Sequence, residues 1–114
     1  SRDPDSGRAP DVSFLRASDV PAGGMPAGYV DSPPTLAVEV LSPSDRSGDV
    51  DRKILEYLHA GTERVWVVDP ENHLITVYRV SGQARVVEPG CTLTSDDSAF
   101  ALDGFALPLD TLFA

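Results

Sequence analysis

The nine residues LAVEVLSPS, positions 36–44, have the pattern of a buried strand that stops at a proline and leads into a helix. Side chains alternate between the two faces of a strand, and both faces here are apolar except at Glu39. This pattern predicts a central strand that is covered on both sides and ends before Pro43.

The single carboxylate in this strand needs a partner. An ionised carboxylate in apolar surroundings is costly unless a metal, a cation or a set of hydrogen-bond donors compensates it. Two other residues could contribute: Asp11 begins a second short apolar run, DVSFL at 11–15, and Lys53 lies on the predicted helix. Two acids on two strands and a lysine on the next helix are the parts of a metal-dependent phosphodiesterase.

The remaining pattern predicts a mixed α/β fold. We expect a helix over 47–60, capped by Ser44 or Ser47 and ended by Gly61, and strands over 12–14, 36–41, 64–68, 74–80, 84–87 and 92–94. The unit over 36–68 should be a parallel strand–helix–strand crossover. Asp96 and Asp97 are expected in a solvated loop, and the tail from Phe100 to Phe113 should pack irregularly.

Two other segments read as loops. Residues 1–10 are turn-like in composition, and residues 16–34 contain four prolines and three glycines, which is typical of a long mobile loop.

Length, composition and net charge limit the number of domains and the classes of function that this chain could have. The chain has 114 residues, enough for one domain, and a net charge of -9 with a pI near 4.4. This charge argues against a broad basic surface for nucleic acid, although bound cations could meet phosphate at a local site. The single Cys91 suits a reducing cytoplasm, and no stretch is apolar enough to predict a membrane span.

Several motifs together carry a resemblance to a known family. They are APDV at 9–12, LAVEVLSPS at 36–44, Lys53 with EY at 56–57 and AG at 60–61, VWVVDP at 65–70, VYR at 77–79, and GFALPL at 104–109 with LF at 112–113. In these motifs the chain resembles the Uma-two putative endonuclease family of the PD-(D/E)XK nuclease superfamily. The resemblance covers nearly the whole chain.

The resemblance implies a restriction-endonuclease-like mixed sheet and a specific site. Asp11 and Glu39 would bind Mg²⁺, for which Mn²⁺ could substitute, and the backbone carbonyl of Val40 would be a further ligand. The superfamily usually has a lysine where Leu41 stands, whereas this family carries it on the next helix, at the position of Lys53. The implied catalytic residues are therefore Asp11, Glu39 and Lys53, and the implied activity is Mg²⁺-dependent endonucleolytic hydrolysis of DNA phosphodiester bonds.

The resemblance also bears on domain organisation and partners. Family members have further elements and a further acidic residue before the aspartate, so residues 1–114 are expected to be the C-terminal portion of a longer nuclease-like domain. DNA is the expected partner. A homodimer is one expected arrangement because many enzymes that cut both strands are dimers, but no segment identifies a self-association surface.

Other interpretations of the same residues stay open. Asp11 could simply begin a strand, Glu39 could form a structural ion pair, and Lys53 could pair with Asp49 on the helix surface. The whole chain could be an inactive nuclease-fold domain that serves as a protein-interaction or assembly module. The net charge, the apolar Leu41 and the expected missing N-terminal part favour that alternative.

Overall fold

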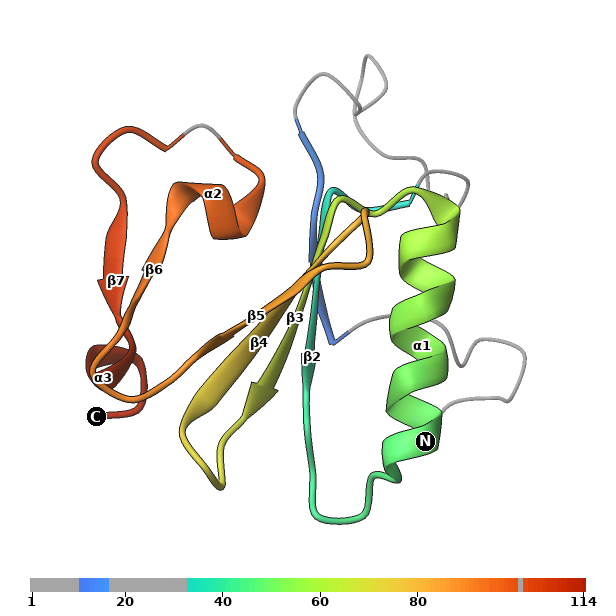
Figure 1. The fold of residues 1–114 in the computed structure, drawn as a ribbon, viewed down its shortest axis with the longest axis horizontal. Coiled ribbons are helices and arrows are strands. Elements are labelled where there is room, and N and C mark those ends of the chain that lie inside the picture. The colour runs from blue at the N-terminus through green and yellow to red at the C-terminus, as the bar shows by residue number, and fades with distance from the viewer. Residues whose placement is uncertain (1–10, 17–32, 101) are drawn as a thin grey trace.

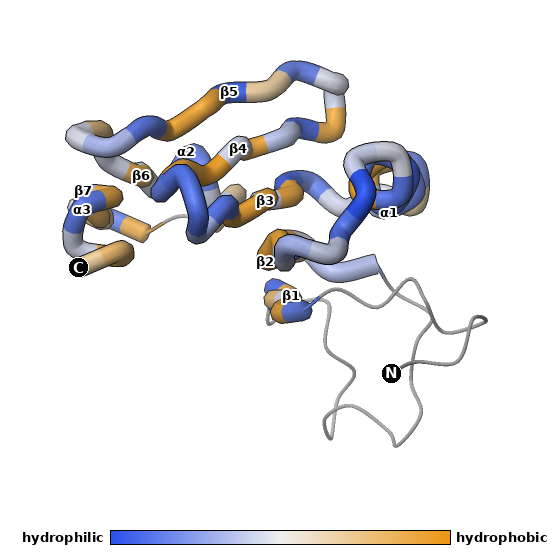
Figure 2. The backbone as a smooth tube through the Cα atoms, turned by 90° about the horizontal axis from the view of Figure 1, so that it is seen from below, coloured by the Kyte–Doolittle hydropathy of each residue, from blue (hydrophilic) through white to orange (hydrophobic). Residues whose placement is uncertain are grey.

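The protein is built around a mixed five-stranded sheet that lies between a helix and a smaller layer (Figures 1 and 2). The computed structural model describes residues 11–16, 33–100 and 102–114. The sheet has the order β1-β2-β3-β4-β5, in which β2 and β3 are parallel and the other neighbours antiparallel. The strands are β1 (Val12–Phe14), β2 (Leu36–Val40), β3 (Arg64–Asp69), β4 (Leu74–Arg79) and β5 (Ala84–Val87). The predicted mixed sheet with a crossover helix is therefore confirmed.

Helix α1 (Ser47–Ala60) covers one face of this sheet (Figure 1). Its apolar stripe packs on the strand residues of that face, in a core made of Ala37, Ile54, Tyr57, Leu58, Val65 and Val67. The helix ends at Gly61, whose φ of 109° lies in the left-handed region that favours glycine. The expected serine cap was wrong: Arg46 is the N-cap and no side chain caps the helix.

The C-terminal residues form a second, regular layer on the opposite face (Figure 2). This layer contains β6 (Thr92–Thr94), α2 (Ser95–Ser98), β7 (Ala106–Pro108) and α3 (Leu109–Leu112). Strands β6 and β7 pair antiparallel, and Leu93 and Leu109 pack against buried side chains of β4 and β5. The prediction of irregular packing for the tail was wrong, because pairing with β6 gives the tail a partner that its own sequence does not reveal.

Ion pairs attach this layer to the sheet. Asp97 is 1% exposed, and both of its oxygens lie 2.8 Å from Arg85 Nη1, while Trp66 Nε1 donates to its carbonyl oxygen. Its neighbour Asp96 pairs with Arg79, and this hydrogen bond lowers the pKa of Asp96 below its ordinary value. The expectation of a solvated loop was wrong in two respects: both aspartates lie in α2, and Asp97 is buried against the sheet, whereas Asp96 is exposed as expected.

The predicted loops over 1–10 and most of 16–34 lie outside the described residues. Of the helices in the described part of the chain, none combines the length and the apolar character needed to cross a membrane.

Replacing Asp97 should loosen the C-terminal layer. In Asp97→Ala, the Thr94 amide and the Arg85 guanidinium lose their acceptor, which should lower the free energy of unfolding by about 2–4 kcal/mol. Urea unfolding followed by Trp66 fluorescence measures the change. The control is Asp103→Ala, which removes an exposed carboxylate and should change stability by less than about 0.5 kcal/mol. Equal stability of the two variants would contradict the structural role of Asp97.

Candidate active site

Glu39 is a buried carboxylate on the face of β2 that α1 covers. It is 7% exposed, and the helix supplies both of its partners. The Tyr57 hydroxyl donates to Glu39 Oε2 at 2.8 Å, and Lys53 Nζ lies 3.5 Å from Glu39 Oε1. The costly carboxylate therefore has one neutral donor and one cation.

Lys53 faces the sheet rather than the solvent. Its side chain is 26% exposed, and its ion pair with Glu39 replaces the pair with Asp49 that the helix spacing also allowed. Asp49 pairs instead with Arg52, at 3.4 Å on the exposed surface. Lys53 and Tyr57 are four residues apart, so consecutive turns of one helix present both groups to the same carboxylate.

Asp11 lies beside the C-terminal end of β2, on the side where β1 pairs with it. The Val40 amide donates to Asp11 Oδ2 at 2.7 Å, just beyond the last strand pair, Val12 with Val38. The Leu41 amide bonds to β3, so Val40, one residue earlier, directs both its amide and its carbonyl toward the β1 side. The carboxylate of Asp11 and the carbonyl of Val40 therefore lie at the same edge of the strand that carries Glu39.

This edge offers oxygen donors of the kind that Mg²⁺ prefers. Candidate donors are the Asp11 oxygen that the Val40 amide does not occupy and the Val40 carbonyl at this edge, together with Glu39 Oε1 on the face under α1. The described ranges contain no group of three or more His, Cys, Asp or Glu side chains that could hold a metal. Mg²⁺ commonly binds through one or two carboxylates and keeps several waters, so this donor set fits it without a larger cluster.

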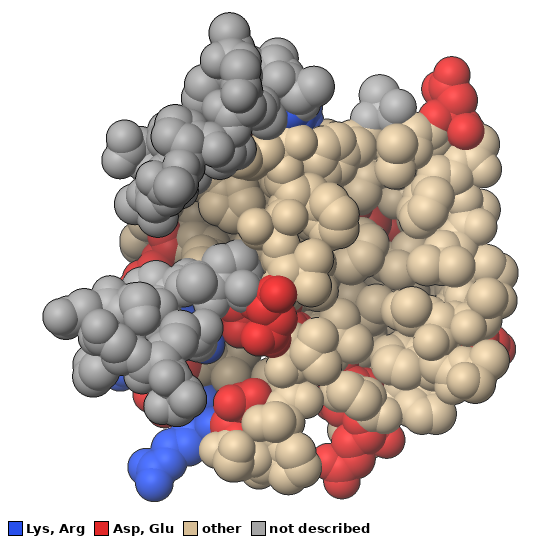
Figure 3. All heavy atoms as spheres, turned by 180° about the vertical axis from the view of Figure 1, so that it is seen from behind, with Lys and Arg blue, Asp and Glu red and all other residues tan. Residues whose placement is uncertain are grey.

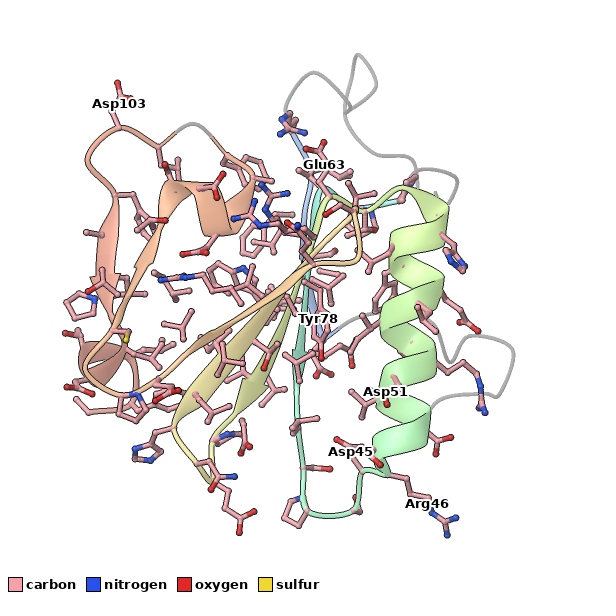
Figure 4. All side chains as sticks on the ribbon, viewed as in Figure 1. Asp45, Arg46, Asp51, Glu63, Tyr78 and Asp103 are labelled. Carbon is pink, nitrogen blue, oxygen red and sulfur yellow. The ribbon has the colours of Figure 1, made fainter. Side chains whose placement is uncertain are left out.

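Leu41 places an apolar side chain two residues after Glu39. It lies on the same face as Glu39, packs against the helix-side core, and lines a hollow of about 300 Å³ near the start of α1. Asp45, Asp51 and Tyr78 also line this hollow (Figure 4), and burial together with Asp51 raises the pKa of Tyr78. The cation that faces Glu39 thus comes from α1, not from β2.

Most basic side chains in the described ranges already form ion pairs, so few are available to bind a polyanion. Six of the seven basic residues in the described ranges form ion pairs: Arg16, Arg52, Lys53, Arg64, Arg79 and Arg85. Figure 3 shows one face of the molecule, on which acidic side chains are spread widely and basic ones are sparse. On the face that Figure 3 draws, the described residues form no broad basic area.

Comparisons with known proteins give a family and a structural relative. A family model described as "Putative restriction endonuclease", Uma2, matches residues 1–110. The structure is similar to the crystal structure of a putative nuclease belonging to DUF820 from Anabaena variabilis, with a TM-score of 0.74 and 27% sequence identity. The match covers 91% of this chain and 58% of that one, so this chain spans less than two thirds of its structural relative. No protein with a curated description is significantly similar in sequence.

Removing the buried carboxylate should destabilise the metal-free protein. Glu39→Ala leaves the Tyr57 hydroxyl without this acceptor and creates a cavity, so the free energy of unfolding should fall by about 2–4 kcal/mol. Urea unfolding in the presence of a chelator measures this effect. Glu88→Ala, at an exposed position, is the control and should leave stability nearly unchanged. A Glu39→Ala variant as stable as the wild type would mean that repulsion from other acids outweighs these contacts.

Proposed function

This chain belongs to the Uma2 family of putative restriction endonucleases, and from that premise we propose that it is a Mg²⁺-dependent nuclease that hydrolyses phosphodiester bonds of DNA. Asp11, Glu39 and the Val40 carbonyl are the proposed metal ligands, with Mn²⁺ able to replace Mg²⁺. Lys53 is the proposed catalytic lysine.

The observation that carries this proposal is the position of Lys53. Its ammonium lies 3.5 Å from Glu39 Oε1, although a lysine at position 41 would be the usual source of this charge. Asp11 accepts the amide of Val40, the residue next to Glu39, which supports the proposal that its carboxylate belongs to the same site. The structural alternative is an ion pair of Glu39 with Lys53 and an Asp11 that only binds the Val40 amide, and metal binding distinguishes it from the proposed site.

Each residue has a distinct task in the proposed reaction. A bound Mg²⁺ would polarise the scissile phosphate and lower the pKa of a coordinated water. Asp11 and Glu39 supply the negative charge that holds the cation, and the Val40 carbonyl adds a fixed oxygen from the strand backbone. Lys53 donates a hydrogen bond toward the phosphate and stabilises the charge that develops as water attacks phosphorus and the sugar oxygen leaves.

The charge distribution supports a dependence on metal. A net charge of -9 and the ion pairing of most described basic residues leave little protein charge to meet a phosphate backbone. Cations bound at the acidic site would supply that charge locally. The inactive interaction module remains the second candidate, since the same net charge and the apolar Leu41 favour it.

A lysine substitution tests the proposed chemistry. Lys53→Met should lower the cleavage rate of plasmid or oligonucleotide DNA by about 100-fold or more, because it removes a charge that acts in the transition state. The matched control is Arg52→Met on the same helix, whose side chain pairs with Asp49 away from the site and whose loss should leave the rate within about threefold.

The same assay includes Mg²⁺, Mn²⁺ and chelator series and the variant Glu39→Gln. The whole protein should cleave only with metal, and Glu39→Gln should reduce both Mn²⁺ binding and cleavage. Wild-type protein that binds neither cation, or cleavage that persists in Glu39→Gln, would overturn the nuclease proposal and leave the interaction module.

A further inference from the structure

The Tyr57 hydroxyl makes the shortest contact to Glu39, and the metal and lysine roles described above do not use it. Its oxygen lies 2.8 Å from Glu39 Oε2, whereas Lys53 Nζ lies 3.5 Å from Oε1. The tyrosine bond is well within hydrogen-bonding range, while the lysine contact is long. The orientation of this carboxylate therefore depends more on the tyrosine than on the ion pair.

The tyrosine ring is itself rigidly held. Tyr57 is 6% exposed and packs among the buried residues beneath α1, including Ala37, Ile54 and Val65. Its backbone carbonyl accepts the amide of Thr62 at the end of the helix, so the turn that carries it is closed by a backbone bond. A ring fixed by the core places its hydroxyl at one point, because a tyrosine side chain has only two main rotatable bonds.

The hydrogen bond from Tyr57 also gives the two carboxylate oxygens of Glu39 different environments. Oε2 is engaged by a neutral donor in the buried interior, and Oε1 faces Lys53. Without the hydroxyl, Glu39 could rotate, and either oxygen could pair with the lysine. Groups that hydrogen-bond a ligand carboxylate fix its orientation and commonly change metal affinity by about 10- to 100-fold.

We propose that Tyr57 is a positioning residue for the metal site: its hydroxyl holds Glu39 Oε2 and so reserves Oε1 for the cation beside Asp11 and Lys53. This role rests on the proposed nuclease function. Tyr57 does not touch the reacting atoms, and it acts only through the carboxylate that it orients. Sequence periodicity alone placed this residue in the apolar stripe of the helix, where its hydroxyl had no assigned task.

A pair of tyrosine variants tests the proposal. Tyr57→Phe keeps the packed ring and deletes the hydroxyl, and Tyr78→Phe makes the same change on β4, where Tyr78 packs against the same core and lines the hollow near the start of α1. Calorimetric titration with Mn²⁺ should show that Tyr57→Phe weakens binding by about 10- to 100-fold, while Tyr78→Phe binds like the wild type. Thermal unfolding reports whether both variants remain folded.

Cleavage assays separate positioning from catalysis. At saturating Mn²⁺, Tyr57→Phe should regain most of its DNA cleavage rate, whereas Lys53→Met should remain slow, because added metal replaces lost affinity but not a lost ammonium. Tyr57→Phe that binds Mn²⁺ as tightly as the wild type would overturn the positioning role. Wild-type protein that neither binds metal nor cleaves would instead overturn the proposed function, so the two failures are distinguishable.

A measurement on the unmodified protein covers the case in which Tyr57→Phe does not fold. A buried hydroxyl that donates to a carboxylate should give a slowly exchanging proton signal in nuclear magnetic resonance spectra. Connectivity to the Tyr57 ring identifies the signal. It should persist when Mg²⁺ is added, because the proposal keeps Oε2 on the hydroxyl while Oε1 meets the cation. Loss of the signal on Mg²⁺ addition would show that metal binding breaks the bond, and would overturn the proposal.

Discussion

The burial of one carboxylate beneath α1 constrains much of this structure. Glu39 is 7% exposed in a strand whose other inward residues are apolar, so its charge must be compensated by groups that the fold brings to it. Helix α1 does this with Lys53 and Tyr57 on consecutive turns. The placement of α1 on the sheet therefore determines two things. It sets how the helix packs on β2 and β3, and it sets which side chains reach Glu39.

The two faces of the sheet make different contacts. The face under α1 carries the Glu39 contacts, and the opposite face carries the layer formed by β6, β7, α2 and α3 (Figure 2). Arginines of the sheet, among them Arg79 and Arg85, are engaged by Asp96 and Asp97 of that layer. These ion pairs offset much of the positive charge that the sheet contributes to the described surface.

Local pattern was sufficient for most of the elements. The bounds of α1 agree with the prediction from Gly61 and the apolar stripe, and β5 and β6 also lie where alternation placed them. The wrong serine cap is a local error at the start of α1, whereas two other errors involve residues whose partners are distant in sequence. Asp97 read as a loop residue because nothing near it shows that Arg85 will bind it, and the tail read as irregular because its pairing partner, β6, lies about a dozen residues earlier.

The same distinction, between local pattern and contacts that are distant in sequence, applies to the candidate site. The sequence by itself determined that Glu39 would be costly to bury and that Lys53, at the margin of an apolar helix stripe, could reach toward a sheet. Only the tertiary structure decided that Lys53 and the Tyr57 hydroxyl meet that carboxylate, and that Asp11 binds the neighbouring Val40 amide. The physical reason is that periodicity specifies the face on which a side chain lies, whereas the distance between two polar atoms is set by how helix and strand pack.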